Sequence, residues 1–129
     1  MELRPVKGKQ IIIYLSHSFT DMSSLLLYSD KSELNTSSTA FKEFVFMNRH
    51  QRTMSANNTL QEVANKLNLK TINSFNHFCN ATTKQCTVID QSGTPMIIDQ
   101  THLSKSGAVE FSAWLSNEII SNLNLQNFH

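Results

Sequence analysis

Glycine is absent from residues 9–92 of this 129-residue chain, and only Gly8, Gly93 and Gly107 occur outside that stretch. Nucleotide-binding loops of the GxGxxG and GxxxxGK types need glycines for tight turns and for close backbone approach to phosphate. The glycine distribution therefore excludes both types of loop. A chain of this length fits one domain, and 40% hydrophobic residues can form a buried core. We expect a single domain over residues 1–129.

The charge of the chain argues against a nucleic-acid partner. Eleven Lys and Arg residues oppose ten Asp and Glu residues, so the net charge is +1, whereas nucleic-acid binding normally needs a clustered basic excess. No apolar run approaches the ~20 residues of a membrane span, and residues 1–5 lack the apolar stretch of a signal peptide. If the domain is exported, we expect another part of a longer chain to carry the signal.

The two cysteines, Cys79 and Cys86, lie in a polar segment. Two thiols are too few for a zinc site unless His77 and a further group join them. Their spacing also differs from that of a CxxC redox pair. A short loop closed by a disulfide and a pair of free thiols both remain open. We favour the disulfide, which would place the domain in an oxidising compartment.

Apolar patterning predicts alternating strands and helices. Residues 11–15 indicate a buried strand entered from a turn at 7–10, and the polar residues 16–38 predict a loop with at most a short helical turn. Helices are expected at 40–45, at 58–67 with Asn58 as N-cap, and at about 104–123 with Ala108, Phe111, Leu115 and Ile119 on the inner face. Short strands are expected at 69–72, 87–89 and 96–98. This alternation indicates an α/β fold with a parallel sheet.

Residues 99–108, with the sequence DQTHLSKSGA, form the most informative segment. Asp99 and His102 stand three residues apart, directly after an apolar strand and directly before an amphipathic helix, where open α/β sheets hold their sites. A histidine there can take a proton from a nucleophile, and an aspartate can hold its other ring nitrogen. The alternative is that both residues only stabilise the entry of the helix. We expect a hydrogen bond between the carboxylate and the imidazole.

The pattern Asp-x-x-His-Leu-Ser-x-x-Gly-Ala resembles the final block of the SGNH (GDSL-type) hydrolase superfamily. It is most similar to the SGNH domain fused to acyltransferase family 3 membrane proteins, which modify bacterial surface polysaccharides. Further similarity includes Phe78-Cys79 with Cys86, and the turn at 93–95 before the strand at 96–98. The resemblance covers residues 7–118. It implies a partial three-layer, flavodoxin-like α/β fold, with His102 as general base and Asp99 as its orienting partner.

The nucleophile of the family is missing from the pattern. SGNH enzymes take it from a Gly-Asp-Ser block on the first strand, and oxyanion donors from a Gly and a Gly-x-Asn block, which the glycine-free stretch cannot supply. We therefore expect the C-terminal part of such a domain, in which residues 10–15 form a late strand. A rival alignment makes Ser16 the nucleophile. Against it, Tyr14 and Leu15 replace Gly-Asp, and bulky residues fit a tight nucleophile elbow poorly.

The resemblance implies an O-acyltransferase or esterase that acts on cell-surface carbohydrate, in the periplasm or elsewhere outside the cytoplasm. The partners would be an acylated carbohydrate or acyl donor and a membrane acyltransferase region in the full-length protein. No metal or organic cofactor is implied. The alternative is a degenerate, non-catalytic SGNH-like module for binding or scaffolding. The other histidines have no partner at metal-ligand spacing and are expected to be solvated or satisfied; they are His17, His50, His77 and His129.

Overall fold

The centre of the fold is a pair of parallel strands. The computed structural model describes residues 10–31, 35–100 and 102–127. Strand β1 (Ile12–Leu15) pairs with β2 (Lys70–Asn73), and the register places Ile12 beside Lys70 and Leu15 beside Asn73. Both strands lie within one residue of their expected positions. The turn expected at residues 7–10 lies, apart from Gln10, outside the described residues.

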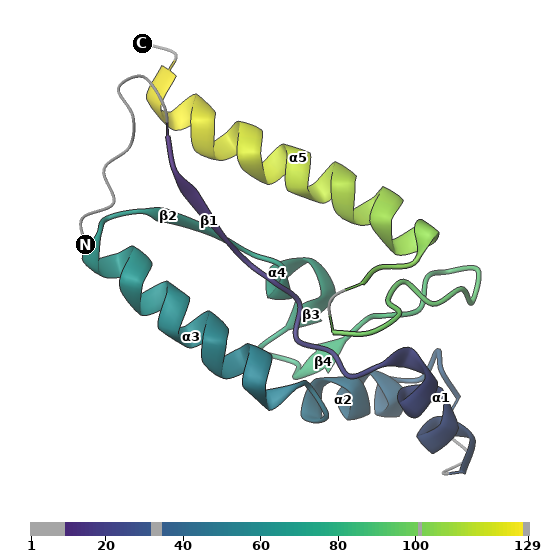
Figure 1. The fold of residues 1–129 in the computed structure, drawn as a ribbon. Coiled ribbons are helices and arrows are strands. Elements are labelled where there is room, and N and C mark those ends of the chain that lie inside the picture. Colours follow the sequence, from purple (N-terminus) through teal and green to yellow (C-terminus); the bar gives the residue numbers. More distant parts are fainter. Residues whose placement is uncertain (1–9, 32–34, 101, 128–129) are drawn as a thin grey trace.

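Helices cover both faces of this sheet. Helix α3 (Gln51–Lys66) lies on one face and α5 (Lys105–Asn127) crosses the other (Figure 1). Leu15, Ile72 and Ala64 are the buried side chains of these layers. The expected α/β class, with a short parallel sheet flanked by helices, is confirmed.

Helix α3 begins eight residues earlier than the sequence predicts. His50, not Asn58, is the N-cap, and its Nδ1 accepts a hydrogen bond from the Thr53 amide at 3.3 Å. The first turns are polar and largely solvent-exposed, so no apolar periodicity marks them. The helix ends at Lys66, and Asn68 follows its C-cap with a left-handed φ of 52°, a conformation that asparagine tolerates better than most residues. The preceding helix, α2 (Thr39–Met47), is close to its expected position, with Ser38 as N-cap.

The prediction of a loop at residues 16–38 is wrong for the middle of this segment. Helix α1 (Met22–Lys31) occupies this region, and the Asp21 carboxylate caps it by accepting the Ser24 amide at 2.8 Å. Met22 and Leu25 are buried, whereas the neighbouring leucines at 26 and 27 are exposed. The helix thus follows from the docking of two side chains and not from a periodic apolar face.

The main core lies beyond the sheet, between α1, α2 and residues 78–97. Its buried side chains are Phe19, Met22, Leu25, Phe41, Val45, Phe78, Cys86, Val88, Met96 and Ile97. One short helix, α4 (Phe75–Phe78), leads into the antiparallel pair β3 (Cys79–Asn80) and β4 (Gln85–Cys86). The expected disulfide joins Cys79 to Cys86 across this pair.

Residues 87–89 and 96–98 do not form the expected strands. Each makes only a single bridge, Ile89 with Pro95 and Ile97 with Leu103, and the Met96 amide donates to the Val88 carbonyl at 2.7 Å. The chain reverses too soon, at the turn that begins with Asp90, for a longer ladder to form.

Gly107 sets the distance between α5 and the segment before it. A Cβ atom at this position would lie 1.8 Å from the Met96 carbonyl oxygen. The same carbonyl accepts the Ser104 amide at 3.1 Å, and Ser104 Oγ accepts the Gly107 amide at 3.1 Å as the helix begins. At Gly107 the first turn of α5 therefore packs directly against backbone, and there is no space for a side chain at this position.

We expect Gly107→Ala to destabilise the chain by about 1–3 kcal/mol, because the added methyl group must displace the Met96 backbone. The higher helix propensity of alanine offsets this only in part. Urea unfolding measures the change. Ser112→Ala, at an exposed position of the same helix, is the control and should have little effect. Equal stability of Gly107→Ala and the wild type would contradict the close contact.

The Asp90 carboxylate makes the stability of the fold depend on pH. Hydrogen bonds from the Ser106 and Ser92 hydroxyls and the Thr94 amide lower the pKa of its carboxyl from 3.8 to about 2. The carboxylate therefore stabilises the fold above about pH 4, and this contribution is lost as the pH falls towards about 2. Asp90→Asn should flatten the pH dependence of the unfolding free energy in this window. Glu62→Gln, which changes an exposed carboxylate, should leave the slope as in the wild type.

Candidate active site

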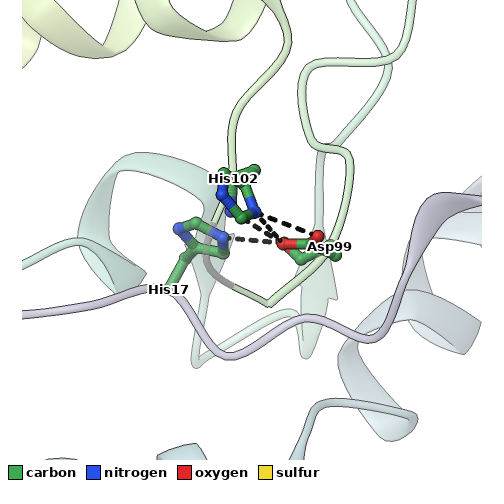
Figure 2. A network of polar contacts seen from close by, with 3 residues as sticks. All are labelled: His17, Asp99 and His102. Atoms are coloured by element: carbon green, nitrogen blue, oxygen red, sulfur yellow. Dashed lines mark hydrogen bonds and ion pairs between the residues drawn. The ribbon is translucent and has the colours of Figure 1, made fainter.

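Asp99 and His102 are joined at a tight turn. The His102 carbonyl accepts the Ile98 amide at 3.0 Å, and the Asp99 carboxylate accepts the His102 amide at 2.8 Å. The His102 Nδ1 atom lies 2.9 Å and 3.0 Å from the two carboxylate oxygens (Figure 2). Because an ionised carboxylate only accepts hydrogen bonds, Nδ1 carries the proton. In the neutral form of the ring, Nε2 is then the nitrogen without a proton.

The pair lies at the surface. The side chain of His102 is 70% exposed and that of Asp99 is 32% exposed. Water screens an ion pair at this level of exposure, so the contact stabilises the fold little. The exposure leaves the ring accessible to a group from outside the pair. The geometry therefore allows a proton transfer between His102 and a group outside the pair.

A third residue, His17, reaches the same turn from the end of β1. Its ring is buried, with 5% exposure, and its Nε2 donates to the backbone carbonyl of Asp99 at 2.9 Å (Figure 2). Burial lowers the pKa of His17, and the hydrogen bond to Asp99 and the charge of its carboxylate offset this only in part. His17 is therefore a neutral donor. The sequence indicated a satisfied histidine but not its partner.

Ser16 is not joined to this group by a hydrogen bond. Its backbone carbonyl accepts the Asn57 side-chain amide at 2.8 Å, and within the described residues no hydrogen bond links its hydroxyl to His102. The structure thus brings together Asp99, His102 and His17. The assignment of Ser16 as nucleophile stays a prediction.

The remaining histidines have structural surroundings. His50 caps α3, and His77 packs against the rings of Phe78, Phe111 and Trp114. His129 lies outside the described residues. In the part of the chain that the structure describes, no group of three or more His, Cys, Asp or Glu side chains could hold a metal ion.

Comparison with known proteins identifies the family. A family model described as an SGNH domain fused to AT3 domains matches residues 5–115. The chain belongs to the SGNH domain family. No curated protein and no solved structure matches it.

Membership of the SGNH domain family supports an acyltransferase or esterase module, and fusion to AT3 domains supports a membrane acyltransferase region in the full-length protein. Tethering to a membrane would follow from that fusion. Among the described residues, no helix has the length and apolar character required to cross a bilayer.

The contact between Asp99 and His102 predicts the tautomer of the ring. In Asp99→Asn, one side-chain oxygen remains to accept two donors, and the new amide group itself donates. We expect the ratio of Nδ1-protonated to Nε2-protonated neutral His102 to fall roughly fivefold. Nitrogen-15 NMR of the imidazole measures this ratio.

The control for this measurement is Asp21→Asn. Asp21 also carries a charge that acts on Asp99, but its oxygens bind Ser24 and not His102. It should leave the His102 ratio unchanged. A wild-type ratio in Asp99→Asn would show that the carboxylate does not set the tautomer.

Proposed function

We propose that this chain is the C-terminal portion of an SGNH-type O-acyltransferase or esterase domain that acts on cell-surface carbohydrate. The contact of Asp99 with His102 Nδ1, at an accessible turn within the family match, carries this proposal. In this function His102 is the general base and Asp99 its orienting partner.

A serine from another segment would attack the carbonyl carbon of an acyl ester. His102 Nε2 takes the proton of the serine hydroxyl as the new carbon–oxygen bond forms, and Asp99 holds the resulting imidazolium through Nδ1. The imidazolium then gives the proton to the departing alcohol oxygen as its bond to the acyl carbon breaks. A sugar hydroxyl or water attacks the acyl-serine by the same proton transfers. Backbone or asparagine donors would stabilise the oxyanion.

Three observations support an incomplete domain over residues 1–129. The parallel sheet has two strands in the described residues, whereas an independently stable sheet usually has three or more. The glycine-free stretch offers no Gly-Asp-Ser elbow. The base is exposed, although such sites work best when water is excluded. A further segment beside β1 would supply the nucleophile and cover His102.

The disulfide supports a location outside the cytoplasm. Such bonds persist in the periplasm and on cell surfaces and are rare in reducing compartments. A periplasmic domain tethered to a membrane acyltransferase would meet acylated carbohydrate or an acyl donor there. The proposed chemistry uses no metal or organic cofactor.

The alternative proposal is a non-catalytic SGNH-like module for binding or scaffolding. The missing glycines favour it, because a relative that has lost its oxyanion donors could keep its surface and fold. The two proposals differ in whether the full-length protein contains a serine whose reactivity depends on His102.

We expect this chain alone to hydrolyse a simple acetyl ester near the background rate, and His102→Ala to leave that rate unchanged. Loss of one oxyanion donor alone costs roughly 10²–10³-fold in turnover, and loss of the nucleophile costs more. In the full-length protein, His102→Ala should lower turnover roughly 10³-fold or more. His77→Phe, which changes a histidine outside the pair, is the matched control.

Two results would contradict the proposal. Turnover by this chain that both His102→Ala and Ser16→Ala abolish would make Ser16 the nucleophile of a compact, complete enzyme. Carbohydrate binding by a full-length protein without esterase or transferase activity would favour the non-catalytic module.

A further inference from the structure

Two hydrogen bonds fasten the segment after β1 to the turn that holds Asp99. His17 Nε2 donates to the Asp99 carbonyl at 2.9 Å, and the Met22 amide donates to the Ile98 carbonyl at 2.7 Å. Two successive carbonyl groups are thus held by donors from the same segment. Only the bond from His17 reaches the residue that also carries the carboxylate.

The ring of His17 is itself held firmly. It stacks on Phe19 at a centroid distance of 5.8 Å and meets the edge of Phe78 at 6.0 Å. The backbone on either side is fixed as well. The Ser16 carbonyl accepts the Asn57 side chain at 2.8 Å, and the Ser18 carbonyl accepts the His50 amide at 2.5 Å. The donor therefore has little freedom to follow Asp99 if the turn moves.

We infer that His17 is a positioning residue, which holds the Asp99 peptide so that the carboxylate stays against Nδ1 of His102. Its relevance to catalysis rests on the proposed function, whereas the structural role does not. Rotation of the Asp99 peptide would swing the carboxylate away from the ring, because the peptide carbonyl and the carboxylate belong to the same residue. Inside the turn, the carboxylate and the His102 amide hold each other at 2.8 Å. Among the described residues, His17 donates to Asp99 from outside the turn.

The protonation of His17 agrees with this geometry. A neutral imidazole has one donor nitrogen, and a carbonyl oxygen only accepts, so the proton of His17 lies on Nε2. The groups that act on it are the Asp99 carboxylate and the His102 ring, while burial disfavours a second proton. His17 thus donates through Nε2 to the backbone carbonyl of Asp99, and His102 donates through Nδ1 to its carboxylate (Figure 2).

The test compares two substitutions of histidine by phenylalanine in this chain. His17→Phe keeps an aromatic ring but removes the donor, and we expect the Nδ1-to-Nε2 proton ratio of neutral His102 to fall roughly fivefold. His77→Phe is the matched control, since His77 also packs against Phe78 but its ring lies against Phe111 and Trp114 instead of Asp99. It should leave the ratio unchanged. His17→Gln offers an amide donor and should restore part of the ratio.

The wild-type spectrum provides a test that does not depend on a variant folding. His17 should be neutral, protonated on Nε2, and show a scalar coupling across the hydrogen bond to the Asp99 carbonyl. A proton on Nδ1 of His17 would overturn the inference, as would a wild-type His102 ratio in folded His17→Phe. A reduced ratio in His17→Phe, with full-length turnover insensitive to His102→Ala, would uphold the positioning role and refute the proposed function.

Discussion

Parallel pairing of β1 with β2 determines where everything else in the structure can lie. Because the strands run in the same direction, residues that follow Leu15 and Asn73 emerge at the same edge, and the Ser74 amide donates to the Leu15 carbonyl there at 3.0 Å. His17, which follows β1, and Phe78, which follows β2 in α4, then pack edge-on against each other. The main core and the candidate site both lie beyond this edge.

The elements predicted well are those whose cause is local. The isoleucines before Leu15 identified β1, and the apolar spacing around Phe111 identified α5. Helix α1 escaped prediction because its place depends on Met22 and Leu25 docking into a core formed by distant segments. The early turns of α3 escaped because they are polar on nearly every side. Tertiary contacts, which a sequence pattern does not contain, determine where both of these helical segments form.

The same distinction applies to the candidate site. The contact between Asp99 and His102 spans three residues, so spacing alone predicted it. His17 lies 82 residues from Asp99, and no periodicity joins them. Its position directly after a buried strand was the available signal, because residues that follow parallel strands gather at one edge. That signal was read for Ser16, whose backbone carbonyl accepts the Asn57 side chain and whose role as nucleophile stays a prediction.

The carbonyl of Met96 limits how far the length of the chain can vary in this region among relatives. This carbonyl accepts the Ser104 amide and lies against Gly107. The chain after Met96 therefore returns to contact the Met96 backbone again. The number of residues between those points is therefore fixed by closure of a ring. A single insertion or deletion between Met96 and Ser104 would change the direction of His102, because both ends of this segment are held in place. Variation in chain length is expected instead in the open turn around Gly93, where space surrounds the backbone.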